Sequence, residues 1–179
     1  DDNDLLRNLN LPPAAAQIVD RTYFENATFV DGQIAFLRQA VSWDQLQKPW
    51  FDVWVPDSEA EDYIGNTVAG LTPADVGAGG FILILPQRRS AMTRRFYKLP
   101  EPECASDWIF LFDILTTSFA PVDDPAFVDA MLTRNRTLYE QARDLGGTRY
   151  PIGALDFFHE DWVEHYGGDW RAFRNRKRR

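Results

Sequence analysis

Cysteine and histidine are scarce in this 179-residue sequence, which contains one cysteine and two histidines. A single thiol, Cys104, excludes an internal disulfide. His159 and His165 stand six positions apart, so on a helix they fall on different faces, and no cluster of carboxylates joins them to make a metal site. Nothing in the sequence places a serine beside either histidine, which argues against a Ser-His-Asp triad.

The sequence also lacks a long hydrophobic segment. It has no run of about 18 apolar residues and no recognisable signal peptide, so no membrane-spanning segment is predicted. Two Asn-X-Thr sequons begin at Asn26 and Asn135, but the second falls within a predicted helix and neither argues for secretion. We therefore expect a cytoplasmic protein, with secretion left open because a piece of a longer protein need not carry its own signal.

Positive charge is in deficit overall but gathers at one end. The formal net charge is −8, which argues against a nucleic-acid partner. Six of the last nine residues are basic, namely Arg171, Arg174, Arg176, Lys177, Arg178 and Arg179. Such an end is typical of the solvated last turns of a helix, whose dipole favours cations there. A phosphate or RNA partner is the alternative.

Glycine is not arranged for phosphate binding. Ala78-Gly79-Gly80 is followed by neither a Gly-x-Gly-x-x-Gly pattern nor P-loop spacing, so this stretch indicates a turn and not a nucleotide site.

What the sequence does have is a globular composition, 45% hydrophobic and 14% aromatic, enough for one folded domain. Apolar runs at 81–85 and 108–115 predict strands, and spaced apolar residues predict helices over 33–47, over 125–145 and in two short turns after His159. Residues 14–30 are interpreted as one or two extended pieces. Because strands and helices do not alternate as βα units, we predict an α+β fold with one antiparallel sheet and helices packed on one face.

The most distinctive stretch runs from Lys48 to Pro56. Two prolines bracket six residues rich in aromatic and β-branched side chains, which predicts a strand with marked ends. Alternation puts Phe51, Val53 and Val55 on one face, and Trp50, Asp52 and Trp54 on the other. The second face is either a ligand platform, with a carboxylate between two indoles, or the half-solvated side of a sheet with Asp52 exposed to water.

Four segments, in order, resemble the cytokinin dehydrogenases, which are flavin-dependent amine oxidases of the vanillyl-alcohol oxidase superfamily. Residues 49–56 resemble that family's Pro-Trp-Leu-Asn-Leu-Phe-Val-Pro strand, and residues 80–86 resemble its next apolar strand. Residues 132–138 resemble its helix carrying Gln-Asn-Arg. Residues 160–167, with Trp170, Phe173 and Lys177, resemble its Asp-Trp…His-Phe-Gly ending. The likeness extends from about residue 29 to the last residue.

The resemblance implies the substrate-binding (cap) domain of an FAD-dependent oxidoreductase acting on CH–NH bonds. Residues 1–179 are expected to be that domain, with the FAD-binding domain absent from the sequence. By resemblance, Trp50, Asp52, Trp54 and Ile152 line the substrate pocket, and Tyr150 lies near the FAD cofactor. The implied partners are the FAD-binding domain of the same protein and a small-molecule substrate, an adenine with a secondary amine at N6. No catalytic residue is expected in this fragment, which should be inactive alone.

The sequence departs from the family at two positions that matter. Asp52 stands where the family has an asparagine, which donates and accepts hydrogen bonds, whereas an ionised aspartate only accepts. A dry, unpaired Asp52 would have a raised pKa, and we expect a donor or positive group on the ligand opposite it. The family's purine-contacting glutamate has no counterpart between Gln33 and Trp50. Oxidation of another small amine or alcohol, or a non-catalytic small-molecule-binding module, is therefore the alternative.

Overall fold

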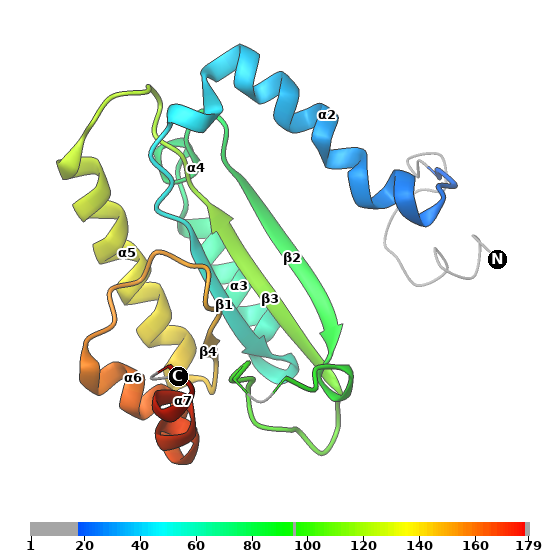
Figure 1. Cartoon of the computed structure of the whole chain (residues 1–179), viewed down its shortest axis with the longest axis vertical. Helices are drawn as coiled ribbons and strands as arrows, with labels where there is room; N and C mark the ends of the chain where they lie inside the picture. The colour runs from blue at the N-terminus through cyan, green and yellow to red at the C-terminus, as the bar shows by residue number, and fades with distance from the viewer. Residues whose placement is uncertain (1–17, 95, 178–179) are drawn as a thin grey trace.

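A computed structural model describes residues 18–94 and 96–177, and its centre is a four-stranded antiparallel sheet of order β2-β3-β1-β4 (Figure 1). The strands are β1 (Phe51–Pro56), β2 (Phe81–Arg88), β3 (Trp108–Leu115) and β4 (Thr148–Arg149). β1, the distinctive stretch of the sequence, lies inside the sheet, paired along its whole length with β3 and over two residues with β4. Pro86 is tolerated in β2 because this strand lies at the edge of the sheet.

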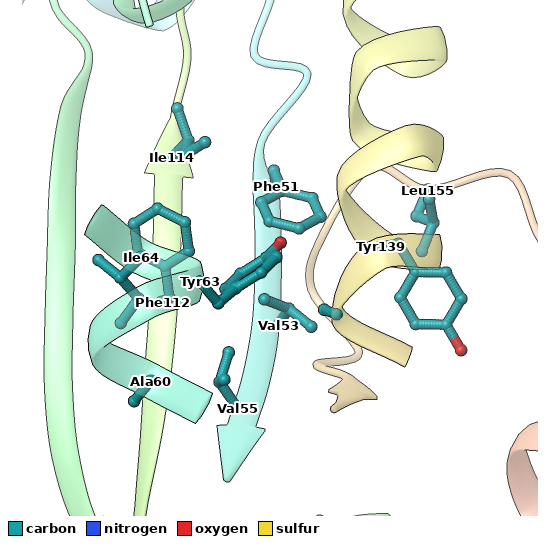
Figure 2. Packing of buried hydrophobic residues seen from close by; sticks show 11 residues of the cluster. Phe51, Val53, Val55, Ala60, Tyr63, Ile64, Phe112, Ile114, Tyr139 and Leu155 are labelled. Atoms are coloured by element: carbon teal, nitrogen blue, oxygen red, sulfur yellow. The ribbon is translucent and has the colours of Figure 1, made fainter. Parts of the chain in front are cut away.

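Helices α3 (Asp57–Gly70) and α5 (Pro125–Asp144) cover one face of this sheet. β1 contributes Phe51, Val53 and Val55 to the covered face, as their alternation predicts. Figure 2 shows the core that results, with Phe112 and Ile114 from β3, Ala60, Tyr63 and Ile64 from α3, and Tyr139 from α5. The predicted α+β fold, an antiparallel sheet with helices packed on one face, is confirmed.

The N-terminal part differs from the sequence prediction. α2 (Tyr23–Val41) is a single helix, so the extended pieces predicted for residues 14–30 are wrong from Tyr23 onward, while residues 14–17 lie outside the described part. Aromatic and β-branched pairs favour strands, but a capping box outweighs them here. The Thr22 hydroxyl accepts from the Glu25 N–H at 3.3 Å, and the Glu25 carboxylate accepts from the Thr22 N–H at 2.8 Å. Figure 1 shows α2 extending away from the sheet, and none of its residues is buried.

Short elements complete the described chain. The 3₁₀ turn η2 (Trp43–Gln45) replaces the predicted last turns of the 33–47 helix, α4 (Pro73–Val76) precedes β2, and η3 (Arg89–Ala91) follows it. The two short helices predicted after His159 are α6 (His159–Tyr166) and α7 (Trp170–Lys177), joined by η4 (Gly167–Asp169). Residues 178 and 179 of the basic end lie outside the described part. No helix within the described ranges is both long and apolar enough to cross a membrane.

One side chain joins the long helix α5 to the central strand. Asn135 is fully buried, and its Nδ2 donates to the carbonyl oxygens of Pro49, Trp50 and Ala154 at 3.1, 3.2 and 2.9 Å. Its Oδ1 accepts from the Nε and Nη2 atoms of Arg134 at 3.2 and 2.8 Å. This amide therefore fixes the start of β1 and the segment beside it, and with them the position of Trp50.

Replacing Asn135 by alanine is expected to lower the free energy of unfolding by roughly 2–4 kcal/mol, because three carbonyl groups lose their donor inside the protein. Thr137→Ala, at an exposed site two residues further along α5, is the control and should change that free energy by no more than about 0.5 kcal/mol. Denaturant unfolding of the full-length protein measures both. Equal losses in the two variants would contradict the role given to Asn135.

Candidate functional site

The face of the sheet turned away from α3 and α5, called here the open face, carries Asp52 and Trp54 of β1. Directly paired residues of antiparallel strands point to the same face. Asp113 pairs with Asp52, and Leu83 pairs with Asp113. These three side chains therefore form a row across β1, β3 and β2. Trp50 lies two residues before Asp52, toward one end of the open face, and Trp54 lies toward the other.

An aromatic cluster closes the Trp54 end of the open face. Trp54 is 1% exposed and packs with Ile109 and Leu111 beneath a layer made by Met92, Tyr97, Leu99 and Tyr150. The ring of Tyr150 meets those of Trp54 and Tyr97 edge-on, with centroids 5.5 and 5.7 Å apart. The Tyr97 and Tyr150 hydroxyls are hydrogen-bonded at 3.3 Å. This end is packed interior.

An apolar pocket of about 850 Å³ occupies the Trp50 end. One wall comes from α2, and the other from Trp43, Trp50, Phe81 and Leu83. The rings of Trp43 and Trp50 lie 6.3 Å apart at an angle of 40°, and the Trp43 indole N–H donates to the Gly79 carbonyl at 3.2 Å. A pocket of this size, with mostly apolar walls, suits a small organic molecule.

Asp52 and Asp113 lie between the pocket and the aromatic cluster. They are 5% and 3% exposed, so the interpretation that Asp52 is exposed to water is wrong. They stand on directly paired residues of β1 and β3, so their carboxyl groups lie side by side on the open face. Asp52 Oδ2 and Asp113 Oδ1 are buried and have no hydrogen-bond partner among the residues that the structure describes.

Burial raises the pKa of both carboxyl groups, because the charged form loses its hydration. The pKa of Asp52 rises to about 6, with the hydrogen bond to Asp113 and the positive charge of Arg149 opposing the rise. The pKa of Asp113 rises to about 8, since the charge of Asp52 adds to the effect of burial. Two acids in such contact titrate as a pair, and near neutral pH they hold one proton between them.

The residues predicted to form the site occupy different environments. Trp50 is half-buried in the pocket wall, and its indole N–H has no hydrogen-bond partner in the described ranges. Asp52 is buried opposite Asp113 and is not among the residues that line the pocket, and Trp54 lies inside the aromatic cluster. Ile152 is 61% exposed in a surface turn. Tyr150 covers Trp54 and donates its backbone N–H to the Asp52 carbonyl at 3.4 Å.

Asp113 is the residue that the sequence reasoning missed. It interrupts the apolar run 108–115, which is the one local signal of something other than core packing. Its face follows from strand pairing, since Asp113 points to the open face because it lies opposite Asp52. Pairing between strands more than 50 positions apart cannot be read from periodicity alone.

The glycine turn before β2 is not a phosphate cradle. The Gly79 N–H donates to the Thr117 hydroxyl at 2.9 Å, and a Cβ at Gly80 would stand 2.0 Å from the Val76 carbonyl oxygen. The turn is therefore packed against its own backbone. What the described residues offer a flavin is an aromatic surface, with the Tyr150 hydroxyl half-buried beside Tyr97, which fits contact with a ring system and not with phosphates.

The two histidines take no part in this region. His165 is buried among the rings of Phe157, Trp162 and Tyr166, and burial together with the charge of Arg149 lowers its pKa to about 4. Within residues 18–94 and 96–177, no group of three or more His, Cys, Asp or Glu side chains is arranged to hold a metal ion.

Known proteins similar to this chain are oxidoreductases. Residues 2–179 match the family described as "Cytokinin dehydrogenase 1, FAD and cytokinin binding". An uncharacterized oxidoreductase, ORF5 in the fasciation locus of Rhodococcoides fascians, is 32% identical over the whole chain, which covers 38% of that protein. Cytokinin dehydrogenase 2 of Arabidopsis thaliana is 27% identical over 97% of the chain, which covers 33% of that enzyme.

The chain thus spans between 33% and 38% of the length of these relatives. The match nevertheless runs through nearly every residue of the sequence and includes the central strand, both core helices and the pocket. The chain belongs to the family of FAD- and cytokinin-binding domains of cytokinin dehydrogenases.

Proposed function

We propose that this chain is the substrate-binding part of an FAD-dependent oxidoreductase that oxidises the CH–NH bond of an adenine substituted at N6. The observation that carries the proposal is the apolar pocket of about 850 Å³ beside Trp50, in a chain of this family. Its apolar walls suit the substrate's side chain, and the flat Trp50 indole suits a heteroaromatic ring.

In this proposal the chain binds and orients the substrate. FAD, held mainly by another domain of the same protein, supplies the acceptor for a hydride from the carbon next to the amine nitrogen. Trp50 stacks on the substrate ring, and Asp52 accepts a hydrogen bond from a substrate N–H. Trp54, packed at 1% exposure, holds the strand behind Asp52 rigid. Ile152, exposed in its surface turn, contacts the substrate, and Tyr150 faces the cofactor side. In this proposal oxidation of the bound substrate depends on groups outside this chain, and the chain is inactive by itself.

A second candidate is an oxidase of another small amine or alcohol. It is favoured by the lack of a glutamate between Gln33 and Trp50 and by the buried acid pair, which introduces a charge beside the pocket. A non-catalytic binding module with the same pocket is the third candidate.

Flavin reduction in the full-length protein distinguishes these candidates. With FAD bound and oxygen excluded, an N6-alkyladenine is expected to bleach the visible absorption band of the flavin. Bleaching by a simple amine or alcohol, but not by the adenine, would support the second candidate. Binding of the adenine without bleaching by any of these compounds would support the module.

Trp50→Ala should weaken binding of the N6-alkyladenine by about tenfold, because the ring loses a stacking surface and buried area. The matched control is Trp108→Ala, which removes an indole that is 42% exposed on β3 and lies outside the pocket. Equilibrium titration of the two variants gives the dissociation constants. Equal dissociation constants for both variants and the unaltered protein would contradict the proposed substrate site at Trp50.

A further inference from the structure

Two arginine-rich stretches that lie far apart in the sequence meet in the fold. One follows β2 and contains Arg94, and the other is the basic end of the chain, where α7 contains Arg176. Phe96 joins them, because its ring meets those of Tyr166 and Phe173 edge-on, with centroids 6.3 and 5.5 Å away. The rings of Tyr166 and Phe173 are stacked on each other with centroids 4.3 Å apart. These contacts hold α7 against the segment that follows β2.

The segment after β2 is irregular but is attached to the sheet at several points. The Tyr97 N–H donates to the Arg94 carbonyl at 3.0 Å, which closes a turn. The ring of Tyr97 packs against the aromatic cluster around Trp54, and the Thr148 hydroxyl of β4 donates to the Lys98 carbonyl at 2.6 Å. The backbone that carries Arg94 is therefore held in place by the sheet.

A pocket of about 430 Å³, called here the basic pocket, lies where the two stretches meet. The described residues that line it are Thr93, Arg94, Phe96, Tyr97, Pro151 and Arg176. None of them is acidic. The two guanidinium groups can only donate hydrogen bonds, and the threonine hydroxyl can also donate. Because a cleft lined by charges of one sign attracts ions of the other sign, the basic pocket suits an anion.

The two arginines of the basic pocket form no ion pair with any residue that the structure describes. The chain has a net charge of −8, and elsewhere its carboxylates do pair with arginines, at 2.6–3.4 Å from Arg38, Arg134, Arg136 and Arg143. The guanidinium group of Arg176 instead lies over the ring of Phe96, 5.8 Å from its centroid. Such stacking positions a guanidinium group and leaves its N–H groups for a ligand.

We propose that the basic pocket binds a mononucleotide that is neither the substrate nor FAD. Arg94 and Arg176 bind its phosphate, since guanidinium groups match phosphate oxygens with paired N–H donors. The half-buried rings of Phe96 and Tyr97 offer the base an aromatic surface. The basic pocket has about half the volume of the apolar pocket beside Trp50, which suits a mononucleotide better than a dinucleotide such as FAD.

The basic pocket is separate from the apolar pocket. The two share no lining residue within the described part of the chain. Tyr97 lines the basic pocket and also covers Trp54, at the packed end of the open face, whereas the apolar pocket lies at the Trp50 end. A nucleotide in the basic pocket therefore leaves the proposed substrate site unoccupied, and this proposal does not rest on the proposed function.

Calorimetric titration of the full-length protein with FAD bound tests the proposal. The probes are AMP and adenosine, which differ by the phosphate. AMP is expected to bind at least about tenfold more tightly, because its phosphate pairs with two guanidinium groups. Arg94→Gln and Arg176→Gln should each weaken AMP binding by about tenfold and leave adenosine binding unchanged. The matched control is Arg174→Gln, which removes the same charge from an exposed position of α7 outside the pocket and should leave AMP binding unchanged.

Three results would overturn the proposal. Equal binding of AMP and adenosine, or equal losses in Arg174→Gln and Arg176→Gln, would mean that the basic end attracts anions without a defined site. Loss of AMP binding in Trp50→Ala, with normal binding in Arg94→Gln and Arg176→Gln, would place AMP in the apolar pocket. Loss of FAD from Arg94→Gln and Arg176→Gln, with no AMP binding to the unaltered protein, would assign the arginines to the phosphates of FAD. None of these measurements depends on oxidation of a substrate.

Discussion

The structure depends on a single buried amide. Asn135 binds the carbonyl oxygens of Pro49, Trp50 and Ala154, which belong to the segment that leads into β1 and to the segment that follows β4. An amide nitrogen is suited to this role because it donates two hydrogens and carries no charge that burial would penalise. With the start of β1 held against α5, the direction of every later side chain on β1 is fixed. The pocket and the acid pair are both consequences of that anchoring.

The two ends of the open face differ because of what lies above them. Over Trp54, the side chains of Met92, Tyr97, Leu99 and Tyr150 form an apolar layer, and the hydroxyls of Tyr97 and Tyr150 are hydrogen-bonded to each other. Over Trp50, the cover is α2, a helix without a single buried residue. The apolar side chains of α2 face a pocket where a packed helix would face core. Along β1 the open face thus changes from a packed cluster at Trp54 to a pocket at Trp50, and Asp52 lies between these two residues.

Much of the fold can be predicted from the local sequence, and each prediction that was wrong has a physical cause. The faces of β1 follow from alternation. The start of α5 follows from Asp124 as the N-cap residue and Pro125 as the first helical residue, and the Asp124 carboxylate accepts from the Phe127 N–H at 3.0 Å. The second half of α2 falls within the predicted helix 33–47, but its first half is interpreted from sequence as extended, because aromatic pairs favour strands and the capping box of Thr22 and Glu25 is a short signal. Trp50 could be singled out as an exposed-face aromatic, but Asp113 could not be joined to it, because strand register is set by the whole sheet.

The acid pair can be understood as a chemical substitute for an amide. The family strand that residues 49–56 resemble has an asparagine where this sequence has Asp52, and an asparagine offers both a donor and an acceptor. Aspartate alone offers only acceptors when ionised, and a lone buried carboxylate would be strongly destabilising. A second acid across the strand changes this balance, since the shared proton neutralises one charge and supplies a donor within the pair. Asp113 therefore makes Asp52 tolerable inside the sheet while adding one net negative charge that an amide lacks.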